Sequence, residues 1–106
     1  MRFGNLESMI GGWFIGAFEP NFYTSQDFEV SIKKYKVGEN EAEHYQRTAI
    51  EITAIISGRA RMGTHYLKDN DLILIEPGES CDFEAITDVL LIAIKCPSIP
   101  EDKVVV

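Results

Sequence analysis

Alternation of apolar and polar residues predicts several β-strands in this chain. It is strictest over residues 28–33, where Phe, Val and Ile alternate with Glu, Ser and Lys. A period of two places one set of side chains on each face of a strand, which is typical of a half-buried strand. Tyr35 departs from the alternation, which predicts a bulge near Lys33 or Lys34.

Short apolar runs separated by Gly, Pro, Asp and Asn predict the remaining strands. They lie at residues 9–18, 44–46, 50–57, 60–62, 65–68, 72–75, 81–85 and 89–94. Glycines interrupt the first run, which suggests bulges or close backbone approach there. The tail from residue 97 holds two prolines and is expected to cross the surface. No segment combines helical spacing with caps, so we predict an all-β fold, either a sandwich or a barrel.

The stretch 38–58 joins polar side chains to a strongly apolar strand. His44 and Gln46 lie in the polar approach, and Glu51 lies inside the apolar run that follows. His, Gln and Glu side chains are costly to enclose without partners. A polar cluster at the mouth or on the inner wall of a β-barrel would explain their position.

The direction of Glu51 separates two interpretations of this strand. If Glu51 faces the interior, Thr53 and Ile55 do so as well. The outer face would then consist of Ile50, Ile52, Ala54 and Ile56. Such a face is too apolar for water and must be covered by residues 9–18 or by a second subunit. If Glu51 faces solvent, the four apolar residues form the core, which is the arrangement that periodicity alone favours.

Length and charge narrow the classes of function. The chain has 106 residues, the size of one domain with a core of its own. Its net charge of −7 argues against nucleic acid and against an anionic membrane surface as partners. No apolar run reaches the roughly 18 residues that a membrane span needs.

The N-terminus and the cysteines indicate a cytoplasmic location. The first residues lack a continuous apolar region and include Glu7, so they do not form a convincing secretion signal. Cys81 and Cys96 are better explained as reduced thiols than as a disulfide framework.

The spacing of polar residues in 38–58 resembles the first motif of the cupin family, G-x5-H-x-H-x3,4-E-x6-G. Gly38, His44, Glu51 and Gly58 occupy their places, and Gln46 stands in the slot of the second histidine. The second cupin motif, roughly G-D-x5-P-x-G-x2-H-x3-N, resembles residues 70–81, where Cys81 lies close to the place of the histidine. The resemblance covers about residues 27–95, and the whole chain is most similar to small, uncharacterised single-domain cupins of the RmlC-like superfamily.

The resemblance implies a double-stranded β-helix, or jelly-roll barrel, and usually a homodimer. The chain would be one cupin domain over residues 1–106. Residues 1–26 would form an N-terminal strand and loop that cover the barrel, 27–96 the cupin core, and 97–106 a C-terminal tail.

Many cupins hold a divalent ion with three histidines and one glutamate. This chain keeps only His44 and Glu51 of that set. Gln46 offers a neutral amide oxygen, a weak ligand, and Cys81 a soft thiolate. A Zn, Fe, Mn or Ni ion held by these four residues is one hypothesis for the cofactor, and the loss of two imidazoles predicts weak binding.

The resemblance leaves three functions open. The first is a cupin that binds a small molecule in a pocket around the same four side chains. The second is a metal-dependent cupin enzyme of the oxygenase type, in which His44 and Glu51 hold the metal. The third is a metal-free isomerase or epimerase acting on a sugar-like carbonyl compound, with His44 as the base. His44 and Glu51 are therefore the catalytic candidates, and fold alone does not choose among these functions.

Overall fold

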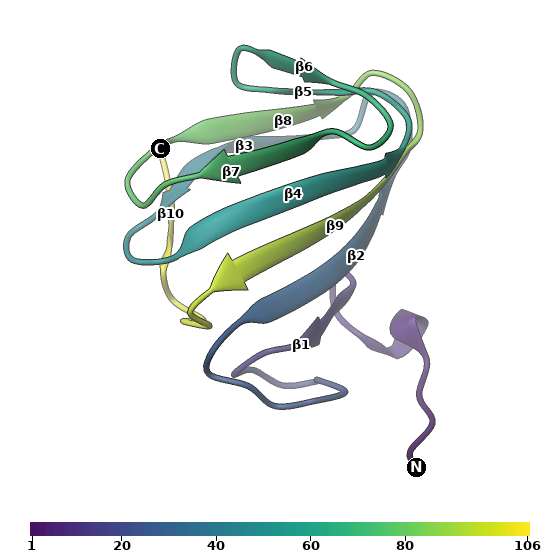
Figure 1. The fold of residues 1–106 in the computed structure, drawn as a ribbon, viewed down its shortest axis with the longest axis vertical. Helices are drawn as coiled ribbons and strands as arrows, with labels where there is room; N and C mark the ends of the chain where they lie inside the picture. The colour runs from purple at the N-terminus through teal and green to yellow at the C-terminus, as the bar shows by residue number, and fades with distance from the viewer.

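Two five-stranded antiparallel sheets face each other and enclose the interior of the protein (Figure 1). The computed structural model describes all 106 residues. A short 3-10 helix, η1 (Leu6–Ser8), precedes ten strands: β1 (Trp13–Ile15), β2 (Glu29–Tyr35), β3 (Asn40–Gln46), β4 (Ile50–Ser57), β5 (Ala60–Met62), β6 (His65–Leu67), β7 (Leu72–Ile75), β8 (Cys81–Ala85), β9 (Val89–Cys96) and β10 (Lys103–Val105). The all-β prediction is confirmed.

Most neighbouring strands in each sheet come from distant parts of the chain. The first sheet has the order β1-β2-β9-β4-β7, and the second has the order β10-β3-β8-β5-β6. Pairs such as β2 with β9 and β3 with β8 wind the chain between the two sheets, as in a jelly roll. No helix of the protein has the length and apolar character needed to cross a membrane.

The two ends of the interior differ in character. One end is a close-packed apolar core, whose nine buried members are Ile55, Ala60, Met62, Leu67, Phe83, Ala85, Val89, Leu91 and Ala93. Toward the other end the inner positions of the first sheet become polar. Glu29, Ser31 and Thr53 of this sheet are buried there, as is Gln46 of β3 in the second sheet, all at 5% exposure or less.

Two glycines show why the sequence permits this packing. Gly58, the last residue of the motif-like stretch, has a φ of +101°, and a Cβ there would lie 2.1 Å from the carbonyl oxygen of Asp88. At Gly12 a Cβ would lie 1.9 Å from the carbonyl oxygen of Ile32. Both positions therefore need glycine, one to turn the chain after β4 and the other to bring β1 against β2.

The structure corrects two expectations about the first strands. β2 pairs with β9 in continuous register from Glu29 to Tyr35, so the predicted bulge near Lys33 or Lys34 is wrong. The irregularity lies in β1 instead, between Trp13 and Ile15, and only these three residues of the run 9–18 form the strand. The alternation broke at Tyr35 because Tyr35 belongs to the inner, largely polar face, not because the strand bends.

The C-terminal residues form part of the second sheet. β10 pairs with β3 from Lys103 to Val105, whereas the sequence suggested a tail crossing the surface. Asp102, only 4% exposed, fixes this strand. Its carboxylate accepts hydrogen bonds from the backbone N–H groups of Thr48, at 3.0 Å, and Ala49, at 2.8 Å. Desolvation raises the pKa of Asp102, but these N–H bonds outweigh it, so the net pKa lies below its ordinary value.

Glu51 faces the interior. Thr53 and Ile55, which share its face of β4, are 3% and 1% exposed. Ile56, on the other face, is 45% exposed. The interpretation in which the apolar residues of this strand form the core is therefore wrong.

Candidate functional site

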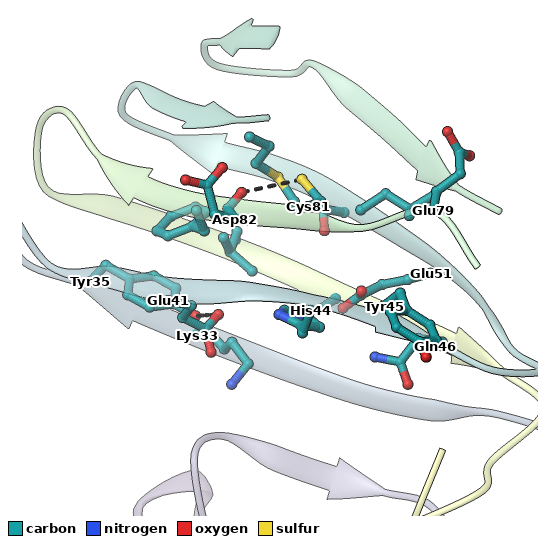
Figure 2. A pocket seen from close by; sticks show the side chains of 16 residues that line it. Lys33, Tyr35, Glu41, His44, Tyr45, Gln46, Glu51, Glu79, Cys81 and Asp82 are labelled. Atoms are coloured by element: carbon teal, nitrogen blue, oxygen red, sulfur yellow. Dashed lines mark hydrogen bonds between the residues drawn. The ribbon is translucent and has the colours of Figure 1, made fainter. Parts of the chain in front are cut away.

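A cavity opens between the two sheets at the polar end of the interior (Figure 2). All four side chains singled out from the sequence line it: His44 and Gln46 from β3, Glu51 from β4 and Cys81 from β8. The free volume between the side chains is about 30 Å³. That is room for one or two water molecules, or for one polar group of a ligand that extends to the surface.

A bulge in β3 aims its side chains into this cavity. The pairing of β3 with β8 shifts register between Glu41 and His44. Without the shift, these two residues, three apart, would point to opposite faces. With it, Glu41, His44 and Gln46 all line the cavity.

Gln46 is the most unusual side chain of the site. It is only 2% exposed, and neither its amide nitrogen nor its amide oxygen has a hydrogen-bond partner within the protein. A buried polar group without a partner costs about 1–3 kcal/mol, so such groups are rare in folded proteins. Gln46 therefore offers both a donor and an acceptor to whatever enters the cavity.

His44 is oriented by the backbone of its own strand. Its Nδ1 lies 2.9 Å from the carbonyl oxygen of Ala42, so in the neutral ring Nδ1–H donates to that oxygen. The other nitrogen, Nε2, is then left to accept a hydrogen bond. No hydrogen bond joins His44 to Glu51.

Cys81 has the properties of a neutral thiol. Burial is the main cause that raises its pKa, and the negative charges of Asp82 and Glu51 raise it further. Its Sγ donates to the carbonyl oxygen of Asp82 at 3.2 Å. A thiol held in this form is a poor metal ligand, since metals bind the thiolate.

The sequence did not single out several other polar residues of the cavity wall. Tyr35 donates a hydrogen bond to Glu41 Oε2 at 2.6 Å, and burial together with that bond raises the pKa of Tyr35. Lys33 lines the cavity as well, and burial is the main cause that lowers its pKa. Lys33 shares a face of β2 with Glu29 and Ser31, as the alternation of residues 28–33 predicted. Nothing in the sequence marked that face as the inner one.

The cavity has an excess of negative charge. Four carboxylates line it, from Glu41, Glu51, Glu79 and Asp82, against the single ammonium of Lys33. Asp82 is compensated by Arg61, whose guanidinium lies 3.0 Å away, and Glu41 accepts the bond from Tyr35. The Glu51 carboxylate has no hydrogen-bond or ion-pair partner in the protein.

The donor set does not fit a resident metal ion. No three side chains of the His, Cys, Asp and Glu types come together closely enough to hold one. Gln46 is a weak ligand and burial raises the pKa of the Cys81 thiol, so His44 and Glu51 are the better donors of the predicted set. The four residues share a cavity, but their chemistry is that of a hydrogen-bonding pocket.

Comparison with known proteins places this fold. No protein-family model and no curated protein matches the chain. Among solved structures, a double-stranded β-helix protein from Klebsiella pneumoniae matches with a TM-score of 0.70 at 18% identity, over 76% of this chain and 71% of the other. An RmlC-like cupin from Shewanella frigidimarina matches with a TM-score of 0.66 at 16% identity, over 73% and 71%.

A larger enzyme shares the same core. The DMSP lyase DddQ from Ruegeria pomeroyi matches with a TM-score of 0.72 at 17% identity, over 88% of this chain but 49% of its own. At such identities the likeness shows the fold and carries no activity. Together with the strand order, it shows that the chain has the double-stranded β-helix fold, the fold of the cupin structures it resembles.

Proposed function

We propose that this protein binds a small polar molecule, neutral or cationic, in the cavity between its two sheets. The observation that carries the proposal is the Gln46 amide, 2% exposed and without a partner for either polar atom. A ligand group that both accepts and donates, such as a hydroxyl, would satisfy the amide and recover the cost of burying it.

The other side chains support the same class of ligand. His44 keeps Nε2 as an acceptor, and Glu51 adds an unpaired carboxylate on the same cavity. The two acceptors, His44 and Glu51, together with the Gln46 amide suit a ligand group rich in O–H or N–H donors. A phosphate or carboxylate would meet the Glu51 and Glu79 carboxylates and be repelled, because like charges close together in a partly buried site are costly.

Three probes of similar size and different charge test the proposal: glycerol, glycerate and 3-aminopropane-1,2-diol. Each is titrated into ¹⁵N-labelled protein while the side-chain amide signals are followed by NMR. We expect glycerol and the aminodiol to shift the Gln46 amide signals, and glycerate to leave them in place. Gln46→Leu should abolish the response of backbone signals from the cavity wall, such as that of Thr53.

The control variant is Tyr66→Phe, which changes a polar atom on the exposed strand β6 and should leave the titrations unchanged. The proposal is overturned if no probe shifts any cavity signal, or if Gln46→Leu responds as the native protein does. Glycerate binding as tightly as glycerol would overturn the charge argument.

The isomerase alternative is examined by the same samples. With dihydroxyacetone in D₂O, loss of its CH₂ proton signals at a rate above that of the buffer, and absent from His44→Ala, would show proton abstraction. Binding without such exchange would favour a pure binding function.

A further inference from the structure

Lys33 lines the cavity without an ion-pair partner. It belongs to none of the ion pairs of the protein, although several carboxylates share the cavity wall. Its Nζ lies 5.1 Å from the centre of the Trp13 ring, and the Nζ of Lys95 lies 4.8 Å from the same ring. An aromatic ring stabilises a cation, but here two ammonium groups share one ring and repel each other. The charged form of Lys33 is therefore poorly supported by its surroundings.

The balance of these effects favours the neutral amine. Burial is the main cause that lowers the pKa of Lys33, and the charges of Lys95 and Lys103 lower it further. The carboxylates of Glu41 and Glu51 act in the opposite direction without reversing the result. A lower pKa leaves more of the amine uncharged at neutral pH, and only the uncharged amine has the lone pair that a nucleophile needs.

The amine lies where a small molecule can reach it. Lys33 lines both the enclosed cavity and a larger surface groove of about 560 Å³ beside η1. Figure 2 shows its amine pointing away from Cys81 and toward β1. On that side a Cβ at Gly11 would lie 3.6 Å from Nζ, so the glycine leaves space next to the amine. The enclosed cavity has room for one polar group of a ligand, and the groove has room for the remainder.

We propose that the amine of Lys33 forms a reversible imine with a small aldehyde or ketone that also carries a hydroxyl group. The inference rests on the proposed binding function, because the hydroxyl is the group that the Gln46 amide would hold. The nitrogen lone pair attacks the carbonyl carbon, and the C=O bond becomes a C–O single bond in a carbinolamine. Water then leaves with the carbonyl oxygen and both hydrogens of the neutral amine, which forms the C=N bond. Hydrolysis reverses the step, and nothing is oxidised or reduced.

A carboxylate is available to move the proton within this step. Glu41 lines the same cavity and the same groove as Lys33. Its carboxylate can take a proton from the attacking nitrogen and return it to the departing oxygen, which is the role of a general acid and base. The hydrogen bond from Tyr35 to Glu41 Oε2 holds this carboxylate in place.

Trapping with cyanoborohydride tests the proposal, because this reagent reduces an imine to a stable secondary amine. The native protein is incubated with glycolaldehyde and cyanoborohydride near neutral pH, and the labelled sites are located by mass spectrometry of peptides cut after glutamate. The α-amine of Met1 also forms imines, so the comparison is made among lysines. We expect Lys33 to carry more of the hydroxyethyl label than any other lysine. The matched lysine is Lys34, the next residue of β2, which is exposed on the opposite face of the strand.

Two variants sharpen the comparison. Lys33→Arg keeps the positive charge and removes the amine, so the label found at Lys33 should be lost. Lys34→Arg should leave the labelling of Lys33 unchanged. Equal labelling of Lys33 and Lys34 in the native protein would overturn the imine, and that measurement does not depend on how either variant folds.

Glycerol separates this inference from the binding proposal, because it carries hydroxyl groups but no carbonyl. If glycerol shifts the Gln46 amide signals while Lys33 takes no more label than Lys34, the imine is overturned and the binding function stands. If Lys33 is labelled selectively while glycerol shifts no cavity signal, the imine stands and the hydroxyl site at Gln46 is wrong.

Discussion

The two faces of the first sheet reverse the usual arrangement of polar and apolar residues. Along β2 and β4, toward the cavity end, the inner face carries Glu29, Ser31, Glu51 and Thr53. The outer face of the same strands carries Val30, Ile32, Ile52 and Ala54, all partly exposed. Alternation predicts that a strand has two different faces, but it does not say which is enclosed. A closed barrel can enclose the polar face, because its interior supplies partners that a flat sheet would leave to water.

Some polar side chains of the inner face have hydrogen-bond or ion-pair partners. Glu29 accepts a hydrogen bond from Ser98 at 2.9 Å and lies 3.9 Å from the ammonium of Lys95. The same ammonium lies 4.8 Å from the centre of the Trp13 ring. The Glu29 carboxylate is therefore satisfied, whereas the Ser31 hydroxyl and the Gln46 amide are not, and of these two only Gln46 lines the cavity. The contrast within one polar end distinguishes residues that hold the fold from residues available to a ligand.

The largest expected effect comes from the apolar end, where adjacent residues of β4 face opposite ways. Ile55 is 1% exposed and Ile56 is 45% exposed. Ile55→Ala should lower the free energy of unfolding by about 3 kcal/mol, since it leaves a cavity in a close-packed core. Ile56→Ala should change it by less than about 0.5 kcal/mol, because this side chain is already largely in contact with solvent. Urea unfolding measures both, and equal effects would contradict the assignment of the two faces.

A smaller effect is expected from Asp102, which attaches β10 to the turn after β3. Asp102→Asn should cost about 2 kcal/mol at neutral pH, because a charged acceptor of two backbone N–H groups is replaced by an amide. The native pKa is lowered, so the carboxylate's contribution is complete above the unfolded pKa of about 3.9 and is lost as the pH falls through the lower native pKa. The difference between the two proteins should therefore shrink below about pH 4.

Urea unfolding at several pH values tests this, with the exposed neighbour Glu101→Gln as control. A difference that persists undiminished at low pH would refute the electrostatic explanation.

The sequence predicted the positions of the strands better than it predicted which face of each strand points to the interior. The all-β class, the position of β4 and the grouping of Lys33 with Glu29 all followed from local pattern. The cupin-like spacing brought His44, Gln46, Glu51 and Cys81 to one cavity because turns at fixed intervals set the strand register. Contacts that join distant segments could not be foreseen, such as Asp102 with residues 48–49 or Ser98 with Glu29. They depend on register shifts and packing that no short window of sequence contains.

The smallest expected effect has the opposite sign and concerns Gln46. Gln46→Leu replaces an enclosed, unpaired amide with an apolar side chain of similar size, which should be neutral or stabilise the ligand-free protein by up to about 1 kcal/mol. The same variant should no longer respond to glycerol. Gln46→Glu is the contrasting variant: a buried carboxylate near Glu51 should destabilise the protein at neutral pH and recover at acid pH. Thermal unfolding of the three proteins without ligand measures both changes.

A clear loss of stability in Gln46→Leu would mean that the amide already has partners and belongs with Glu29 among the structural residues. A gain in stability accompanied by loss of binding is the pattern of a residue kept for function at the expense of the fold. In that case the difference between the two faces has a functional meaning. The inner face keeps polar groups for a ligand. The apolar side chains of the same strands lie on the outer face instead of in the core.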